Sequence, residues 1–269
     1  MTTTANRPVY DEARAEAFAE TLVGHLNASA LTLMTSLGHR AGLFDAMDGL
    51  APSTSTEVAQ AAGLNERYVR EWLGAMVTGG FVDYDADRET YVLPPEHAAF
   101  LTRRATPDNI AVFAQYVPVL AQVEDRILEC FRHGGGVPYE AFGRFHEVMA
   151  EDSGQTVLSS LLSLVLPLVD GLRPRLRQGL DVLDVGCGRG RALILMAETY
   201  PNSRFVGYDL SRDVVAAANA EAKSRGLDNL RFEARDVTDL GDAAAFELVT
   251  AFDAIHDQAH PARVLEGIH

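Results

Sequence analysis

The stretch 181–190, D-V-L-D-V-G-C-G-R-G, has the residue types of a ligand-binding turn. An apolar run that carries one acid, Asp184, breaks into three glycines at alternate positions, Gly186, Gly188 and Gly190. A near-continuous apolar run followed by glycines is typical of a buried parallel strand that turns into a helix. Glycines permit the tight turn and let the backbone approach a ligand closely. The stretch therefore predicts a binding loop between a strand and a helix.

Acidic residues follow the later apolar runs of the same region. The pairs are 204–208 with Asp209, 230–234 with Asp236, and 246–252 with Asp253. Strands that alternate with helices at this spacing predict an α/β fold with a Rossmann-like, doubly wound parallel sheet. Ligands bind such sheets beyond the carboxyl ends of the strands, where these acids stand. Asp209 lies 23 residues after Gly186 (209 − 186), a spacing at which an acid can accept hydrogen bonds from ribose hydroxyls.

Two competing kinds of site fit the sequence poorly. The dinucleotide pattern G-x-G-x-x-G would need a glycine where Arg191 stands. His256 and His260 are four residues apart with an acid between them, which is zinc-binding spacing when the residues lie on a helix. Pro261 favours the first turn of a helix, so these histidines precede a helix instead. We expect no metal site.

Residues 1–100 predict a helical domain with a winged helix-turn-helix. Thr54 and Glu57 have the spacing of a capping box, Asn65 can cap a second helix, and two short strands flank a turn at 85–88. A long helical pattern over 9–47 comes first. Its apolar face either packs in the core or contacts a second copy of the chain. We expect a homodimer formed through these N-terminal helices.

The charge of the chain disfavours nucleic acid as a partner. The net charge is −15, and residues 1–100 contain six arginines against fourteen Asp or Glu. Arg67 and Arg70 are flanked by Glu66 and Glu71. A winged helix commonly binds DNA through its second helix, but a phosphate-binding surface needs a basic field. We therefore expect this unit to serve dimerisation and packing, with DNA binding as the less favoured alternative.

Residues 101–178 predict a helical linker that includes a possible substrate lid. A helix over 155–177 is expected to bend at Pro167. Aromatic and neighbouring side chains gather after a glycine-rich loop, and they form either ordinary core contacts or the apolar wall of a substrate pocket. These residues are Tyr139, Phe142, Phe145, His146 and Met149.

The motif 183–190, L-D-V-G-C-G-R-G, resembles the first motif of the class I S-adenosylmethionine-dependent methyltransferases. The resemblance covers about 179–269 and implies that S-adenosylmethionine is the cofactor. It implies that Gly186 and Gly188 lie against the methionine part, that Asp209 holds the ribose hydroxyls, and that Asp236 contacts the adenine. The full set of implied cofactor-binding residues is Asp184, Gly186, Cys187, Gly188, Gly190, Asp209, Leu210, Asp236, Val237, Phe252 and Asp253.

A winged-helix domain ahead of such a fold is similar to the small-molecule O-methyltransferases and to a bacterial group of winged-helix methyltransferases sometimes described as regulators. In the O-methyltransferases a His-Asp pair follows the fourth strand, where this chain has His256 and Asp257. The resemblance implies that His256 is the general base for an oxygen nucleophile of a small-molecule acceptor and that Asp257 lies beside the reacting methyl. A neutral imidazole can accept a hydroxyl proton at physiological pH. Gln258 departs from the aromatic residue usual there, and a DNA-binding regulator or an inactive fragment stays an alternative.

The resemblance also implies a sheet of seven strands, whereas four are predicted before His269. We therefore expect the cofactor domain, 179–269, to be C-terminally incomplete, truncated after the fourth strand.

Composition points to a cytoplasmic protein without a membrane segment. The two cysteines, Cys130 and Cys187, have no metal-ligand spacing and fit a reducing compartment. The N-terminus lacks the basic and apolar segments of a signal peptide, and no apolar run approaches the roughly 20 residues of a membrane span.

Overall fold

The computed structural model describes residues 10–238, 240, 241, 245–256 and 258–269. The chain divides into two compact units, Met1–Ala105 with Ile110–Pro118 and Thr106–Asn109 with Val119–His269. Each unit has its own hydrophobic core. The division into 1–100, 101–178 and 179–269 stays a prediction.

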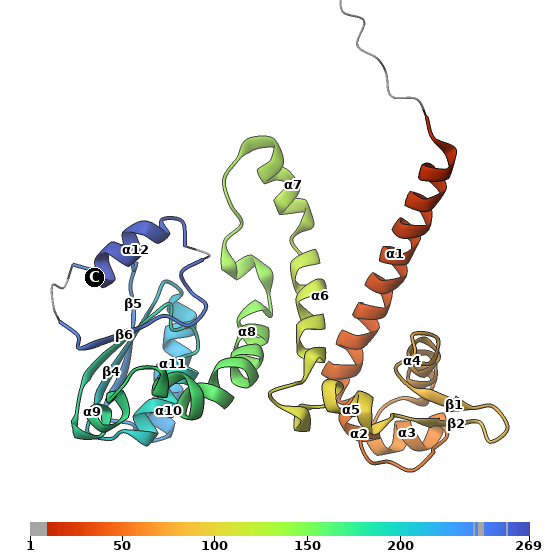
Figure 1. Cartoon of the computed structure of the whole chain (residues 1–269), viewed down its shortest axis with the longest axis horizontal. Coiled ribbons are helices and arrows are strands. Elements are labelled where there is room, and N and C mark those ends of the chain that lie inside the picture. Colours follow the sequence, from red (N-terminus) through yellow and green to blue (C-terminus); the bar gives the residue numbers. More distant parts are fainter. Residues whose placement is uncertain (1–9, 239, 242–244, 257) are drawn as a thin grey trace, which may run out of the picture. The chain divides into compact units, whose positions relative to one another are not determined.

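The first unit is a winged helix-turn-helix preceded by one long helix (Figure 1). Thr54 and Glu57 form the predicted capping box, in which each side chain accepts a hydrogen bond from the backbone N–H of the other residue. Asn65 caps the following helix by accepting from the Arg67 N–H. The elements are α1 (Glu12–Ala41), α2 (Leu43–Met47), α3 (Ser55–Ala62), α4 (Glu66–Thr78), the antiparallel β1 (Asp83–Asp85) and β2 (Thr90–Val92), α5 (Pro95–Leu101), and the 3-10 turns η1 (Arg103–Ala105) and η2 (Ile110–Gln115).

Trp72 of α4 fixes the long helix to the helix-turn-helix. Its indole N–H donates to the Met34 carbonyl over 2.9 Å, and its ring meets Phe44 edge-on at 5.2 Å between centroids. A side chain at position 38 of α1 would clash with this ring, which explains the glycine there. The carboxyl-terminal part of α1 is therefore packed in the core, but through another face: Thr35, Ser36 and His39 are buried. The leucines of the predicted apolar face, Leu26, Leu33 and Leu37, are exposed, so this face does not pack in the core.

The helical part of the second unit is less regular than the sequence predicts. The expected single helix over 155–177 is wrong: two π-helical turns, a 3-10 turn and a short α-helix occupy this stretch. Pro167 has no N–H to donate and stands in the 3-10 turn, so the preceding helical turns end there. This helical part is preceded by α6 (Tyr116–Ala121), whose first three residues belong to the first unit. The elements that lie wholly in the second unit are α7 (Glu124–His133), η3 (Tyr139–Phe142), α8 (Phe145–Ser153), the π-helical η4 (Gly154–Leu158) and η5 (Leu161–Val165), η6 (Leu166–Leu168) and α9 (Leu172–Gln178). Of the helices described, none alone has the length and apolar character that crossing a membrane requires, although the bent pair Phe145–Leu168 and Leu172–Gln178 together meets both criteria.

A parallel four-stranded sheet organises the rest of the second unit (Figure 1). Its strands are β3 (Asp181–Val185), β4 (Arg204–Asp209), β5 (Leu230–Ala234) and β6 (Leu248–Thr250), and its order is β5-β4-β3-β6. The helices that follow strands are α10 (Arg191–Thr199), α11 (Arg212–Ser224) and α12 (Pro261–Ile268). This order reverses direction at β3, which is the point where doubly wound sheets open a crevice for ligands. The predicted α/β fold with a doubly wound parallel sheet is confirmed.

Both faces of the sheet are covered. Phe205 of β4 belongs to a cluster that includes buried residues of α10 and α11, whereas Val206 and Tyr208 belong to a second cluster that includes Val264 of α12. This alternation follows from the strand period of two and explains why successive residues in the middle of β3 and β4 are all buried. The carboxyl ends of the strands are left to form a site.

Candidate functional site

A cavity of about 470 Å³ lies at the carboxyl ends of the strands. The loops that follow all four strands line it, and the segment from Tyr139 to Leu158 supplies a further wall. Every residue predicted to bind the cofactor lines this cavity: Asp184, Gly186, Cys187, Gly188, Gly190, Asp209, Leu210, Asp236, Val237, Phe252 and Asp253. The structure thus brings the predicted set together, and the role of each member is taken up below as a proposal.

The glycine loop is shaped by contacts that leave no room for side chains. Gly190 has φ +69°, and a Cβ there would clash with the Phe232 ring of β5. Gly186 has φ +71°, and a Cβ there would clash with Ala254. At Gly188 a Cβ would meet only open space, so the backbone is accessible from the cavity that it lines. A ligand can therefore approach the main chain of this loop closely.

Two carboxylates at the cavity are held by backbone N–H groups. Asp209 accepts from Gly188 through Oδ2 and from Ser211 through Oδ1, each over 2.9 Å. Asp236 accepts from the Thr238 N–H over 2.9 Å and from its hydroxyl over 2.7 Å. These two bonds hold the pKa of Asp236 below its usual value, and the bond from the backbone N–H has the larger effect. The carboxylate oxygens keep further lone pairs with which they can accept bonds from ligand hydroxyls or amines.

Asp184 is the buried acid of the site, with 2% of its surface exposed. It accepts a hydrogen bond from the Thr250 hydroxyl of β6 over 2.8 Å. Burial raises the pKa of its carboxyl to about 7; the Thr250 bond opposes the rise and the nearby Asp209 adds to it. Burial likewise raises the pKa of the Cys187 thiol, so that this thiol is protonated and is no nucleophile at physiological pH.

An aromatic wall faces the strand ends. We use this name for Tyr139, Phe145, His146 and Met149, all of which line the cavity. Tyr139 stacks on Phe145 with 5.6 Å between ring centroids, and each ring lies 5.9 Å from the His146 ring. The π-helical η4 continues this side with Val157 and Leu158, and π-helical turns recur at functional sites.

One long-range hydrogen bond ties the aromatic wall to the glycine loop. Arg191, the first residue of α10, donates from Nη1 to the Ala150 carbonyl of α8 over 2.7 Å. Arg189, within the loop, also lines the cavity. Sequence reasoning used Arg191 only to reject the dinucleotide pattern and gave Arg189 no role. The available signal was one arginine inside the glycine loop and a second directly after it, in a chain with a net charge of −15.

The predicted base lies next to the cavity and not on its wall. His256 is absent from the cavity-lining residues, whereas His146 and His260 are among them. His256 Nδ1 lies 3.4 Å from Asp253 Oδ1, and about two thirds of each side chain is exposed. Asp253 has φ +55°, a left-handed conformation that is uncommon outside glycine and that recurs at functional sites. Asp257 lies outside the described residues, and the part of the chain that the structure describes holds no group of three or more potential metal ligands.

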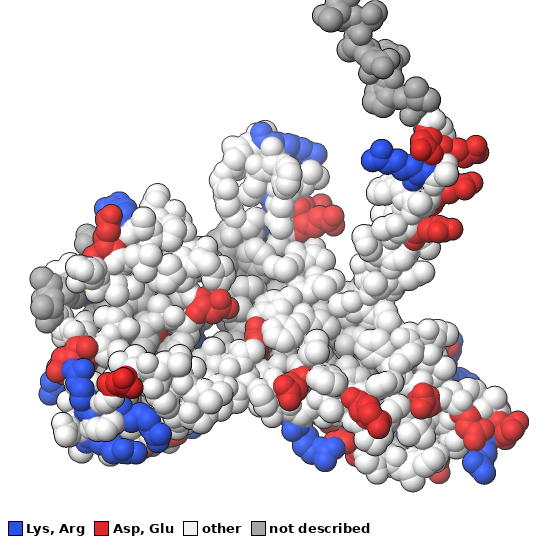
Figure 2. Space-filling view, in the orientation of Figure 1, with Lys and Arg blue, Asp and Glu red and all other residues white. Residues whose placement is uncertain are grey.

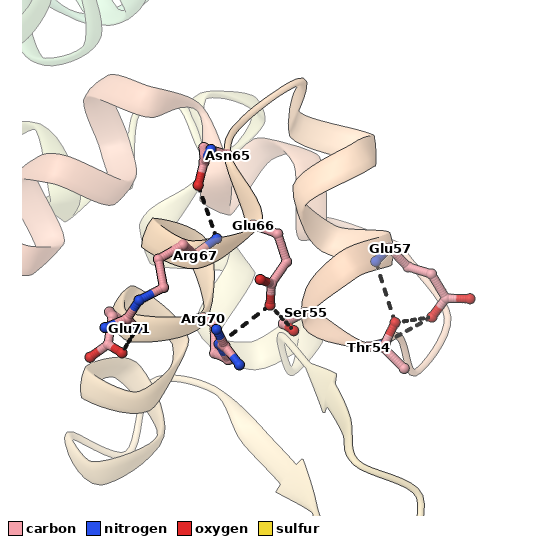
Figure 3. A network of polar contacts seen from close by, with 8 residues as sticks. All are labelled: Thr54, Ser55, Glu57, Asn65, Glu66, Arg67, Arg70 and Glu71. Atoms are coloured by element: carbon pink, nitrogen blue, oxygen red, sulfur yellow. Dashed lines mark hydrogen bonds and ion pairs between the residues drawn. The ribbon is translucent and has the colours of Figure 1, made fainter.

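The arginines of α4 are occupied by carboxylates of the same helix (Figure 3). Arg67 pairs with Glu71, and Arg70 lies 3.5 Å from Glu66, which also accepts from the Ser55 hydroxyl over 2.7 Å. On the face in view in Figure 2, acidic side chains are interspersed among the basic ones over the described winged helix, without a continuous basic surface. Phosphate binding through these two arginines would first require that their ion pairs be broken.

Comparison with known proteins gives matches for both parts of the chain. Residues 29–103 match a family described as Rv2258c-like winged HTH domain, and residues 176–269 match one described as methyltransferase domain. Nocamycin O-methyltransferase of Saccharothrix syringae is 42% identical over 86 residues, which are 31% of this chain and 30% of that protein. The chain spans less than a third of the length of the first curated relatives that it matches.

Two solved structures share the fold over almost the whole chain. The mitomycin 7-O-methyltransferase MmcR has a TM-score of 0.67 at 19% identity, covering 96% of this chain and 78% of its own. Human N-acetylserotonin methyltransferase, in complex with SAM, has a TM-score of 0.62 at 16% identity, covering 100% of this chain and 77% of its own. At these identities the likeness is one of fold.

Proposed function

We propose that this chain, which joins an Rv2258c-like winged helix-turn-helix domain to an S-adenosylmethionine-dependent methyltransferase domain, transfers a methyl group from that cofactor to an oxygen atom of a small molecule. One observation carries the proposal: the loops after all four strands converge on a single cavity, and they bring the whole predicted cofactor set with them. The domain match supports the class and its cofactor, while the acceptor and the roles of the residues are our inference.

The donor set of the cavity fits S-adenosylmethionine. When bound, the cofactor supplies an electrophilic methyl group on a positively charged sulfonium. Asp209, Asp236 and Asp253 line the cavity and give it the negative potential that favours such a cation. We assign the ribose hydroxyls to Asp209, the adenine to Asp236 with Val237, and the methionine part to the open backbone at Gly188. The residues would thus act mainly by alignment, which can lower the barrier of a two-substrate reaction substantially.

The pair His256 and Asp253 supports proton removal from the acceptor. A carboxylate at Nδ1 favours the tautomer in which Nδ1 carries the proton and Nε2 is free to accept one. In the proposed step His256 Nε2 would accept the proton of the acceptor hydroxyl, and the bound cofactor would supply the methyl group for the acceptor oxygen. Asp253, assigned from the sequence to cofactor binding, would in addition orient the base.

A small-molecule acceptor is favoured over a polymer. The net charge of −15 opposes a polyanionic nucleic acid, and the wall opposite the strand ends is made of aromatic and apolar side chains. The names of the matched nocamycin and mitomycin enzymes describe O-methylation of small molecules, which is the same class of acceptor. The paired arginines of α4 give no support to a DNA-binding function.

We also propose a homodimer formed through α1. This helix of 30 residues exposes several large apolar side chains, Phe18, Leu22, Val23, Leu26, Leu33 and Leu37, between 41% and 67% exposed. A row of this kind on one helix is typical of a protein-binding surface. A second copy of α1 presents the same surface, as a two-fold interface requires.

Calorimetric titration of the full chain with S-adenosylmethionine and with S-adenosylhomocysteine tests the proposed function. We expect both to bind at one site. Thermal unfolding measured alongside must show a folded protein whose midpoint rises with added ligand. A folded chain that binds neither compound would overturn the proposal.

A further inference from the structure

The cavity holds two arginines among its acids, and they differ in one respect. Arg191 has a hydrogen-bond partner within the protein, because its Nη1 donates to the Ala150 carbonyl. The Arg189 Nε is buried and has no hydrogen-bond partner among the described residues. Four aspartates line the same cavity, yet none of them forms an ion pair with Arg189. Arg189 Nε therefore lacks a described partner because of where its side chain lies, and not because carboxylates are missing from the cavity.

The position of Arg189 is set by the glycine loop. Its two neighbours have left-handed backbones, Gly188 with φ +53° and Gly190 with φ +69°. The Phe232 ring packs where a Cβ of residue 190 would stand, and Gly188 is held by its bond to Asp209. The main chain on both sides of Arg189 is thus fixed, so its side chain is presented to the cavity from a rigid support.

A buried guanidinium N–H without a hydrogen-bond partner has lost its hydration, which costs free energy. A ligand group that accepts a hydrogen bond from it offsets that free energy. The planar guanidinium presents paired donors that match the two oxygens of a carboxylate. Neutral ligand groups would leave its positive charge uncompensated. A ligand carboxylate is therefore the partner that suits Arg189 best.

We propose that the Arg189 guanidinium binds a carboxylate of the ligand that occupies this cavity. The proposal rests on the proposed function, since it adds a contact to the same site. The carboxylate can come from the amino-acid end of the cofactor or from the acceptor. The two sources differ in which compound loses affinity when Arg189 is replaced.

Titration of two related adenosine compounds distinguishes the sources. S-adenosylhomocysteine carries the amino-acid carboxylate, and 5′-methylthioadenosine lacks the whole amino-acid end. For Arg189→Gln we expect S-adenosylhomocysteine to bind roughly 10- to 100-fold more weakly and 5′-methylthioadenosine to bind as it does to the unchanged chain. Arg189→Lys keeps the charge but loses the paired donors. Its affinity for S-adenosylhomocysteine should therefore lie between that of the unchanged chain and that of Arg189→Gln. This pattern assigns the carboxylate to the cofactor.

The acceptor arm uses benzoate as the probe, titrated into the chain saturated with S-adenosylhomocysteine. Weaker benzoate binding by Arg189→Gln, with unchanged S-adenosylhomocysteine affinity, assigns the carboxylate to the acceptor. The control variant is Arg231→Gln, which removes an exposed arginine of β5 that is paired with Glu233 and does not line the cavity. It should leave all affinities unchanged.

Two results would overturn the inference. One is an equal loss for S-adenosylhomocysteine and 5′-methylthioadenosine, which would mean that the loop itself is disturbed; the other is no loss for either compound or for benzoate. Circular dichroism of each variant establishes that it is folded, and Arg189→Lys decides the matter if Arg189→Gln does not fold. If the unchanged chain binds neither adenosine compound, the proposed function fails, and that result is distinct from a loss confined to the variants.

Discussion

The Gly188 N–H donates to the Asp209 carboxylate over 2.9 Å, and this bond joins the glycine loop after β3 to the end of β4. A second N–H, from Ser211, holds the other oxygen of the same carboxylate. Asp209 thus has one role in the fold, where it anchors the loop, and one in the proposed function, where it accepts from ribose hydroxyls. Because one side chain has both roles, they are separated by measuring both ligand affinity and stability in variants of Asp209.

Replacing Asp209 should weaken cofactor binding more than it weakens the fold. For Asp209→Ala we expect S-adenosylhomocysteine to bind about 10- to 100-fold more weakly, because bonds to a charged acceptor are lost. Calorimetric titration measures the loss. Asp213→Asn, an exposed acid in the first turn of α11 that does not line the cavity, serves as the control. An Asp209→Ala variant with unchanged affinity would remove Asp209 from the cofactor site.

Asp184 should make the stability of the ligand-free chain depend on pH. Its pKa in the folded chain, about 7, lies above the ordinary 3.8. The folded state therefore holds the proton more tightly, and the contribution of this group is complete below about pH 4 and is lost as the pH rises to about 7. Within that window it lowers the free energy of unfolding by about 1.4 kcal/mol per pH unit.

Asp184→Asn should abolish this slope, since the amide does not titrate. Urea unfolding at pH 5 and pH 8 is the measurement, and the variant should gain stability relative to the unchanged chain at the higher pH. Asp213→Asn should show the pH dependence of the unchanged chain. Parallel stability profiles for Asp184→Asn and the unchanged chain would contradict the expectation.

Gly190 and Gly226 form a matched pair for testing the shape of the loop. Both have φ +69°, but a Cβ at 190 would clash with Phe232, whereas at 226 it would meet open space. Gly226→Ala should cost about 1–2 kcal/mol of unfolding free energy from the backbone alone. Gly190→Ala should cost a further 1–3 kcal/mol or so, because the core is overpacked there. Equal losses in urea unfolding would show that the Phe232 contact does not shape the loop.

His256→Ala should slow methyl transfer about 100- to 10,000-fold if His256 is the general base. The measurement follows labelled methyl groups from S-adenosylmethionine into a panel of hydroxylated small molecules. Cofactor affinity should be unchanged. His133→Ala, an exposed histidine that pairs with Glu129 and does not line the cavity, is the control.

Asp253→Asn tests whether the carboxylate acts through His256. Asparagine tolerates the left-handed backbone of residue 253, so the loop should persist. We expect a roughly tenfold slower reaction in the unchanged background and no further loss in a His256→Ala background, as a double-mutant cycle requires of a coupled pair. Equal losses in both backgrounds would mean that Asp253 acts independently of His256.

The apolar row of α1 should control the oligomeric state. Changing Leu22 and Leu26 together to Glu should convert a dimer to a monomer, because the charges could not be buried in the interface without a partner. Sedimentation at several protein concentrations measures the mass. Tyr68→Glu on α4, which removes another exposed side chain of the same unit, should leave the dimer intact. A monomeric unchanged chain would rule out the proposed dimer.

Local patterns sufficed to predict much of this fold. The capping box at Thr54 and the Asn65 cap of α4 depend on contacts within a few residues, and such contacts can be predicted from spacing. That the residues after the strands would line one cavity could be predicted, because parallel strands bring their carboxyl ends to one edge whatever the sequence between them.

Contacts between distant segments could not be read in this way. The π-helical turns after α8 break the helical period, and the bond from Arg191 to Ala150 joins residues 41 apart in sequence. The sequence predicted a strand over 246–252, whereas β6 covers only Leu248–Thr250, because pairing with β3 determines how far that strand extends. The sequence pointed to His256 because of its place in a motif. That His146 and His260 line the cavity could not be predicted, because it depends on how distant segments pack.

The bond from Arg191 to Ala150 has a consequence for the divergence of related chains. Arg191 contacts a backbone carbonyl, and every amino acid supplies one at that position. Mutations can therefore replace the side chains of the aromatic wall one after another without removing the bond that attaches α8 to the start of α10. Under the proposed function, acceptor preference could then change by drift in one short segment while the glycine loop stays as it is.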